Sequence, residues 1–298
     1  MTDSMAVGFI GIGNMGWPMA ANLVKAGFRV AVYDADPQRC EAFCKEYQAS
    51  APGLAALAGS EVVVTMLPDG YIVREVLMNT TESAFINALQ AGTVIVDMSS
   101  SAPAGTRELA AELALKKVTL VDAPVSGAVP RATTGTLTIM AGSDDPAALE
   151  TARPVLNALG ERIFEVGRSG CGHAAKALNN YLGATAFAAT SEAILIAQRF
   201  GLDANTLVDI LNVSTGKSFI SEVVMKDHVL HEQYATGFKL GLLAKDVKIA
   251  TDLGQAVGLQ APLLHLVNER WELAEALVGY DADNSEAIKG WRDDLLPD

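Results

Sequence analysis

A glycine-rich stretch near the N-terminus constrains the fold more than any other feature. The segment Gly8–Gly16, with the sequence GFIGIGNMG, links a short apolar run to a helix-like pattern that ends at Gly27. Gly11, Gly13 and Gly16 have the spacing G-x-G-x-x-G. The first glycine permits a tight turn, the second lets the backbone approach a pyrophosphate, and the third lets the helix pack closely on the strand. The N–H groups at the helix start favour a phosphate, so the stretch predicts a dinucleotide-binding turn.

An acidic residue follows at the expected distance. A second apolar run, Phe28–Tyr33, ends in Asp34, which lies 23 residues after Gly11. A carboxylate about 20 residues after the first glycine binds the adenosine ribose in such folds. Asp34 would repel a 2′-phosphate, and Ala35 and Asp36 follow it rather than an arginine, so we expect NAD rather than NADP. A tight turn with an unrelated surface aspartate is the alternative interpretation.

Residues 1–166 predict an α/β domain with a doubly wound, mostly parallel sheet. Apolar runs rich in Val, Ile and Leu show little polar alternation, as in strands that are buried on both faces. They alternate with helical patterns in βαβ order. The expected strands are Ala6–Ile10, Phe28–Tyr33, Glu61–Leu67, Thr93–Met98, Val118–Asp122, Leu137–Ala141 and Arg162–Val166. The expected helices are Asn14–Ala26, Pro37–Tyr47, Gly70–Met78, Pro103–Lys116 and Pro146–Leu159.

Residues 167–298 predict a second, all-α domain. Its expected helices are Gly170–Phe200, Ala204–Val213, Phe238–Val257, Leu263–Val278 and Ser285–Trp291. The first of these is apolar nearly all round, which raises the alternative of a membrane span. Asn179, Asn180 and Glu192 interrupt it and would be costly in hydrocarbon. A buried helix on which others pack, or a subunit interface, is the favoured interpretation.

Composition excludes several classes of partner. The net charge of −13 argues against a nucleic acid or an anionic membrane surface. Three cysteines form an odd and sparse set, as in reduced cytoplasmic proteins, and neither they nor the four histidines have the spacing of a metal site. The first five residues show no basic segment followed by an apolar one, so we expect no signal peptide.

Polar residues follow several expected strands. Leu67-Pro68-Asp69 and Ser99-Ser100-Ser101 end two of them, and ligands of doubly wound sheets bind beyond the carboxyl ends of strands. We therefore expect these loops beside the dinucleotide, with ordinary polar loops as the alternative. After a further strand, Ser126-Gly127 offers a hydroxyl and an unobstructed N–H that together could hold a carboxylate. A purely structural turn is the alternative there.

A third polar group lies on the long helix. Lys176, Asn179 and Asn180 stand at positions i, i+3 and i+4 and share one face. A lysine in an apolar, Ala-rich helix usually has a partner or a function. Burial and the helix N-terminus both disfavour its charged form, which suits proton transfer. A lysine that extends to solvent at a domain edge is the alternative.

These residues together resemble the β-hydroxyacid dehydrogenase family, which includes 3-hydroxyisobutyrate dehydrogenase, tartronate semialdehyde reductase and L-threonate dehydrogenase. The resemblance covers almost the whole chain. It rests on four motifs in the family's order, which are Gly8–Leu23, Asp122–Gly127 with Gly135–Thr138, Gly170–Asn180 and Lys245-Asp246. Four ordered motifs are far more specific than a single G-x-G-x-x-G.

The resemblance assigns roles to individual residues. It implies that Lys176 is the catalytic lysine, that Ser126 and Gly127 anchor the substrate carboxylate, and that Asn180, with Asn179 beside it, contacts the substrate. Together with the glycine turn and Asp34, the expected dinucleotide contacts are Gly11, Gly13, Asn14, Met15, Gly16, Asp34, Leu67, Pro68, Ser100 and Lys245. Family members pair an N-terminal Rossmann domain with an all-α domain through which they form dimers or tetramers, so a homodimer or homotetramer is expected.

Several positions depart from the family pattern around the expected substrate site. Ala128 and Arg131 stand where glycines are common, His173 stands where glutamine is frequent, and Ser100 replaces a common threonine. These changes bear on the identity of the substrate more than on the chemistry. Arg131 has two open interpretations, a contact to a second polar group of the substrate or a solvent-facing arginine. The segment Asn212–Lys217 looks more like the hydroxyisobutyrate and threonate branches than the tartronate branch.

The sequence therefore predicts a cytoplasmic, NAD-dependent oxidoreductase for a small β-hydroxy acid or its semialdehyde, 3-hydroxyisobutyrate-like, with no metal. Lys176 would exchange the hydroxyl proton in a cleft between the two domains. A tartronate semialdehyde reductase or threonate dehydrogenase is the related alternative. Chains of 6-phosphogluconate dehydrogenase are usually longer, and imine reductases typically lack the lysine. A catalytically silent dinucleotide sensor is the alternative outside enzymes, and Lys176, Ser126 and Asn180 count against it.

Overall fold

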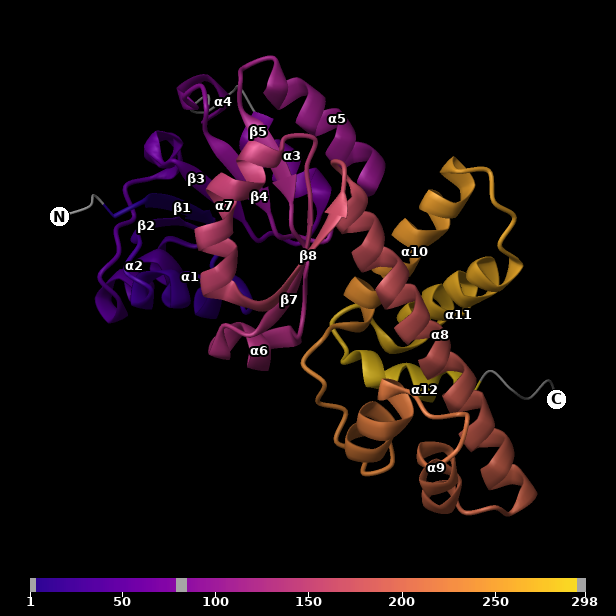
Figure 1. The fold of residues 1–298 in the computed structure, drawn as a ribbon. Coiled ribbons are helices and arrows are strands. Elements are labelled where there is room, and N and C mark those ends of the chain that lie inside the picture. Colours follow the sequence, from indigo (N-terminus) through magenta and orange to yellow (C-terminus); the bar gives the residue numbers. More distant parts are fainter. Residues whose placement is uncertain (1–3, 79–84, 294–298) are drawn as a thin grey trace. The chain divides into compact units, whose positions relative to one another are not determined.

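The chain divides into two compact units, Met1–Lys176 and Ala177–Asp298. The computed structural model describes residues 4–78 and 85–293, so the start of the segment Met1–Met5 lies outside the described residues. In Figure 1 the first unit runs from indigo through magenta to salmon, and the second continues through orange to yellow. The predicted domain boundary after residue 166 precedes the division between these units and stays a prediction. Each unit is described by itself.

The first unit is built on one twisted sheet. Among the described residues it has eight strands in the order β2-β1-β3-β4-β5-β7-β6, with β8 beside β7. The strands from β2 to β5 are parallel, β7 is antiparallel to β5 and β6, and β8 is parallel to β7. Their bounds are β1 Ala6–Ile10, β2 Arg29–Tyr33, β3 Val62–Thr65, β4 Val94–Asp97, β5 Thr119–Asp122, β6 Val125–Ser126, β7 Leu137–Gly142 and β8 Gly160–Gly167.

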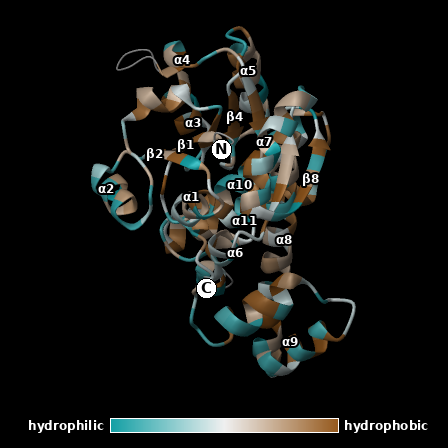
Figure 2. Cartoon of the chain, turned by 60° about the vertical axis from the view of Figure 1, so that its left-hand side comes forward, coloured by the Kyte–Doolittle hydropathy of each residue, from teal (hydrophilic) through white to brown (hydrophobic). Residues whose placement is uncertain are grey.

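Alternate residues of each central strand face opposite layers of helices. Val62 and Val64 of β3 belong to one core cluster, whereas Val63 belongs to another on the opposite face. In Figure 2 the ribbon of the central strand β4 has the brown colour of hydrophobic residues, as expected for a strand covered on both sides. Helices α1 (Gly16–Lys25), α2 (Pro37–Glu46) and α7 (Pro146–Leu159) cover one face. The 3₁₀ turn η1 (Leu54–Gly59) and helices α3 (Gly70–Met78), α4 (Phe85–Ala88) and α5 (Pro103–Ala114) cover the other.

This architecture confirms the predicted α/β fold class, with four elements that the sequence did not reveal, namely η1, α4, β6 and α6. All seven expected strands exist, and their bounds differ from the expected ones by at most a few residues. The strand β6, Val125–Ser126, is too short for a periodic signal. Helix α6 (Ala128–Thr134) contains Pro130 and only seven residues, and α4 has only four. Elements of this length carry too few apolar positions for periodicity to identify.

All regular elements among the described residues of the second unit are helical. Its elements are α8 (Cys171–Phe200), which begins in the first unit, α9 (Ala204–Asn212), η2 (Ile220–Val229), α10 (Leu240–Ala256), α11 (Pro262–Val278), η3 (Asn284–Glu286) and α12 (Ala287–Asp293). Its core centres on Trp271 and Trp291, whose rings meet edge to face at 5.5 Å beside Phe187. Element η2 is a π-helix, whose repeat the expected 3.6-residue period does not detect. Within the described ranges, no helix has the length and apolar content of a membrane span.

The three glycines of the motif have different steric surroundings. Gly11 has φ +91°, and a Cβ there would lie 2.4 Å from the carbonyl oxygen of Met66. A Cβ on Gly16 would lie 1.9 Å from the carbonyl oxygen of Gly11. A Cβ on Gly13 would meet nothing closer than Nη1 of Arg39 at 3.6 Å. The fold itself therefore requires glycine at two of the positions, and at Gly13 only a bound molecule could require it.

This difference predicts opposite effects for two alanine substitutions. Gly16→Ala should destabilise the protein by ~2 kcal/mol or more, because the backbone of helix α1 must move away from β1. Gly13→Ala should leave the melting temperature near that of the parent and weaken NADH binding at least about tenfold, or ~1.4 kcal/mol, if a pyrophosphate approaches there. Thermal melting and NADH fluorescence titration measure the two effects. Unchanged NADH affinity in the folded Gly13→Ala protein would contradict the assignment.

Candidate active site

The carboxyl ends of the neighbouring strands β1 and β3 form the point where the sheet order reverses. The chain passes from β1 to β2 on one side of β1, and then crosses to β3 on its other side. The loops after β1 and β3 touch, since a Cβ on Gly11 would lie 2.8 Å from a side-chain carbon of Leu67. Open α/β sheets bind their ligands at such a switch point. The expected cofactor residues Gly11–Gly16 and Leu67 are thus brought together at this edge.

No side chain of the described residues caps the start of helix α1. Met15 occupies the N-cap position without a side-chain hydrogen bond, and no acidic side chain lies in the first turn. The next helix, α2, differs, because the Asp36 side chain accepts a hydrogen bond from the N–H of Gln38 at its start. Helix N-termini with uncapped N–H groups favour phosphate. The glycine turn therefore meets the steric and electrostatic requirements of a pyrophosphate.

Asp34 is held in place at the end of β2 by the glycine turn itself. Its Oδ2 accepts a hydrogen bond from the N–H of Ile12 at 2.9 Å, and its Oδ1 accepts one from the N–H of Asp36 at 3.0 Å. Nη1 of Arg39 lies 3.9 Å from Oδ2. Carboxylate oxygens accept more than one bond each, so Asp34 retains acceptor capacity for ribose hydroxyls. Arg39, which helix α2 places next to this carboxylate, was not among the site residues expected from the sequence.

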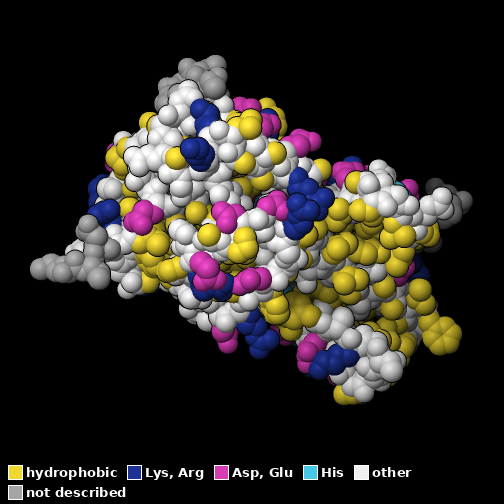
Figure 3. Space-filling view, turned by 45° about the horizontal axis from the view of Figure 1, so that its top comes forward, with side chains coloured by type: hydrophobic (Ala, Val, Ile, Leu, Met, Phe, Trp, Pro, Cys, Tyr) yellow, Lys and Arg dark blue, Asp and Glu magenta, His cyan; other side chains and the backbone are white. Residues whose placement is uncertain are grey.

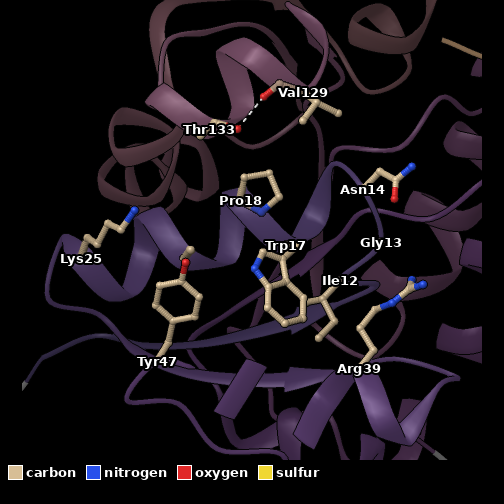
Figure 4. Close-up of a pocket in the computed structure, with 11 residues that line it drawn as sticks. Ile12, Gly13, Asn14, Trp17, Pro18, Lys25, Arg39, Tyr47, Val129 and Thr133 are labelled. Carbon is tan, nitrogen blue, oxygen red and sulfur yellow. Dashed lines mark hydrogen bonds between the residues drawn. The ribbon is translucent and has the colours of Figure 1, made fainter. Parts of the chain in front are cut away.

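A cavity of about 420 Å³ adjoins the glycine turn and runs along helix α1 (Figure 4). Its lining residues include Gly13 and Asn14 at one end and Tyr47 beyond Trp17. Two cations, Lys25 and Arg39, line it, and no carboxylate does. In a chain with a net charge of −13, such a local excess of positive charge suits an anionic ligand.

Buried carboxylates end strands β4 and β5 and hold the loops around the site. Oδ1 of Asp97 accepts hydrogen bonds from the hydroxyl of Thr65 at 2.9 Å and the N–H of Ser99 at 3.0 Å, and Oδ2 accepts one from the hydroxyl of Ser101 at 3.0 Å. Oγ of Ser99 in turn accepts a hydrogen bond from the N–H of Leu67 at 3.0 Å. Asp97 therefore holds the loops after β3 and β4, which contain the expected cofactor residues Leu67, Pro68 and Ser100.

The second carboxylate, Asp122, holds the beginning of helix α8. Its Oδ1 accepts a hydrogen bond from the N–H of Gly170 at 2.8 Å, and its Oδ2 accepts one from the N–H of His173 at 3.0 Å. Burial raises the pKa of the Asp122 carboxyl above its usual value, while the nearby His173 opposes that rise. In the sequence, Asp97 and Asp122 each end a buried apolar strand, and this position was the signal for their structural roles.

The expected substrate anchor lies at the start of helix α6. Ser126 ends β6, and Gly127 has φ +135°, where a Cβ would lie 2.6 Å from Cδ of Arg131. The Arg131 guanidinium has its own partner in the same unit, Oε2 of Glu161 at 3.6 Å, and its side chain is 46% exposed. This placement favours the solvent-facing interpretation of Arg131.

The remaining expected site residues lie on helices α8 and α10. Lys176 is partly buried and belongs to the first unit, whereas Asn179 and Asn180 belong to the second. Nδ2 of Asn180 donates a hydrogen bond to Oδ2 of the buried Asp246 at 2.6 Å, and Nδ2 of Asn179 donates one to Oδ1 of Asn180 at 3.2 Å. Nζ of Lys245 lies 3.4 Å from Oδ1 of Asp246. Asp246 therefore orients Asn180, a role that the motif alone did not reveal.

Both parts of the chain match known protein families. Residues 6–167 match the NAD-binding domain of 6-phosphogluconate dehydrogenase. Residues 170–291 match the NAD-binding family of NADP-dependent 3-hydroxyisobutyrate dehydrogenase. The two matches together cover nearly the whole described chain.

Individual relatives are similar over almost their full length. The 2-(hydroxymethyl)glutarate dehydrogenase of Eubacterium barkeri is 36% identical over 98% of this chain and 96% of its own. The NAD-dependent L-serine dehydrogenase of Pseudomonas aeruginosa is 34% identical over 86% and 88%. The structure of Mycobacterium tuberculosis 3-hydroxyisobutyrate dehydrogenase with L-serine has a TM-score of 0.87 at 31% identity, covering 97% of this chain and 99% of that one. The chain therefore belongs to the β-hydroxyacid dehydrogenase family and is an NAD-dependent hydroxyacid dehydrogenase.

Proposed function

We propose that the chain interconverts a small β-hydroxy acid and its semialdehyde, with Lys176 as the general acid and base. The observation that carries this proposal is the arrangement on helix α8. Lys176 and Asn180 are one turn apart on the same helix, and Asp246 holds the amide of Asn180 at 2.6 Å. An oriented amide next to a lysine is the arrangement expected where a hydroxyl must be both positioned and deprotonated.

The residues divide the chemistry among them. In the oxidation direction the neutral amine of Lys176 takes the hydroxyl proton of the substrate, and in reduction its ammonium returns one. Bound NAD supplies the hydride acceptor for the hydrogen on the hydroxyl-bearing carbon. Asn180 orients the hydroxyl group of the substrate. Ser126 and the N–H of Gly127 bind the substrate carboxylate without adding a charge. Asp34 binds the adenosine ribose.

The relatives suggest a common substrate pattern. The compounds in their names, 3-hydroxyisobutyrate, L-serine and 2-(hydroxymethyl)glutarate, all contain a CH₂OH group on the carbon that bears the carboxylate. We propose substrates of the form HOCH₂–CHR–COO⁻, in which the group R varies. A carboxylate anchor made of a hydroxyl and an N–H recognises the shared part and places no requirement on R. The same pattern includes the substrate pair of a tartronate semialdehyde reductase.

We propose further that the protein acts in the cytoplasm as a homodimer or homotetramer. The described part of the all-α unit exposes large apolar side chains on helix α8, namely Leu182 at 64%, Ile196 at 65% and Phe200 at 89%. Figure 3 shows apolar side chains gathered over part of the surface on the right of the view. Contiguous apolar surface of this kind marks association sites. The thiols of Cys40, Cys44 and Cys171 are free, in accord with a reducing compartment.

Replacing Lys176 tests the proposed mechanism. Lys176→Ala should lower turnover by roughly 10²–10⁴-fold, which is the usual contribution of a general acid or base. NADH affinity should persist, because the glycine turn and Asp34 do not involve the lysine. Lys176→Arg should not restore turnover, because a guanidinium does not release its proton near neutral pH. Turnover of Lys176→Ala within a few-fold of the parent, with a lowered melting temperature, would instead show a structural lysine.

Replacing Asp34 tests the basis of cofactor choice. Asp34→Ala and Asp34→Asn both remove the negative charge, so the preference for NAD over NADP in kcat/KM should narrow by about tenfold or more, or ~1.4 kcal/mol. The asparagine keeps an acceptor for the N–H of Ile12 and thereby separates charge from backbone support. Adding Arg39→Ala should reverse the gain with NADP, because Arg39 would then be the cation nearest the 2′-phosphate. An unchanged preference in Asp34→Asn would contradict this account.

A further inference from the structure

The side chain of His173 occupies the centre of a buried polar cluster that the proposed mechanism does not use. Its imidazole is fully buried, as is the Asp122 side chain, and Asp97 is 2% exposed. Nδ1 lies 2.8 Å from the hydroxyl oxygen of Thr106, a residue of helix α5, and that hydroxyl also donates to the carbonyl oxygen of Ala102 at 3.1 Å. Buried polar groups are costly unless they are paired, so such a cluster requires an explanation.

The imidazole lies between the two carboxylates. Nε2 is 3.6 Å from Oδ2 of Asp97, and Nδ1 is 4.0 Å from Oδ2 of Asp122. Among the described residues, Nε2 has no hydrogen-bond partner. One side of the imidazole therefore faces the carboxylate that holds the loops after β3 and β4. The other side faces the carboxylate that holds the start of helix α8.

The backbone around His173 leaves little freedom to adjust. The N–H of His173 is bonded to Asp122, and the neighbouring Gly172 has no room for a side chain, since a Cβ would lie 2.6 Å from the carbonyl oxygen of Asp122. Lys176 follows His173 by three residues on the same helix, so both lie on one face about one turn apart. Any shift of the imidazole would therefore be passed to the first turns of α8, where the lysine lies.

We propose that His173 is a positioning residue for the reaction. Its imidazole fills the space between the Asp97 carboxylate, which orders the loops after β3 and β4, and the Asp122 carboxylate, which orders the start of helix α8. Its packing there and its bond to Thr106 hold Lys176 in register with the bound dinucleotide. This inference rests on the proposed role of Lys176. Removing the imidazole leaves Asp97 with its three hydrogen bonds to Thr65, Ser99 and Ser101, so the cofactor loops persist while the lysine loses its alignment.

The test compares His173→Leu with His173→Gln in the full-length enzyme. The reaction rate of each protein is divided by its concentration of NADH-binding sites, which a fluorescence titration measures. A lower yield of folded protein therefore does not lower the value. His173→Leu should lower kcat at least about tenfold, since a misplacement of ~1 Å costs up to roughly 100-fold. KM and the NADH dissociation constant should change less than kcat. His173→Gln, whose amide can still bond to Thr106, should recover most of the loss.

A matched control and a second background complete the experiment. His228→Leu removes a partly buried imidazole from η2 in the other unit and should leave kcat per site unchanged. In the Lys176→Ala background, His173→Leu should cause no further loss, because the residue acts through the lysine. Equal loss in both backgrounds, or normal kcat per site with only a lower melting temperature, would overturn the inference. Near-parental turnover of the single variant Lys176→Ala would instead overturn the proposed function. This outcome is distinguishable, because it does not depend on any His173 variant.

Discussion

The close approach of helix α1 to the end of β1 is the contact on which the rest of the first unit depends. Only a glycine at position 16 lets the helix lie against the carbonyl oxygen of Gly11. The same turn donates the N–H of Ile12 to Asp34 and packs Gly11 on Met66. The ends of β1, β2 and β3 therefore meet at one turn, where helix α1 begins without a side-chain cap.

Much of this arrangement could be predicted because it is local in the sequence. Buried parallel strands such as Val62–Thr65 are continuous apolar runs, and the turn between β1 and α1 has a steric signature in its glycines. The elements that the sequence did not reveal are short or irregular. Strand β6 has two residues, and η2 has a π repeat, so neither produces a periodic pattern long enough to detect.

The buried polar contacts could not be predicted from local patterns. Asp122 accepts hydrogen bonds from Gly170 and His173, about 50 residues further along the chain, and Asp246 accepts one from Asn180 in an earlier helix. Residue spacing predicted which side chains share a helix face, and it contains no information on pairs that only the tertiary fold brings together. Arg39 is different, because it lies in the first turn of the predicted helix that follows Asp34 and could have been found from the sequence.

The central claim is that this dehydrogenase acts on a hydroxymethyl group next to a carboxylate-bearing carbon. The most direct measurement is the rate of NADH or NADPH formation with 3-hydroxyisobutyrate, glycerate, serine and L-threonate, each tested with NAD and with NADP. The account predicts turnover with at least one of the first three, which share HOCH₂–CHR–COO⁻, and faster turnover with NAD. Turnover with none of the first three, or with L-threonate alone, would contradict it.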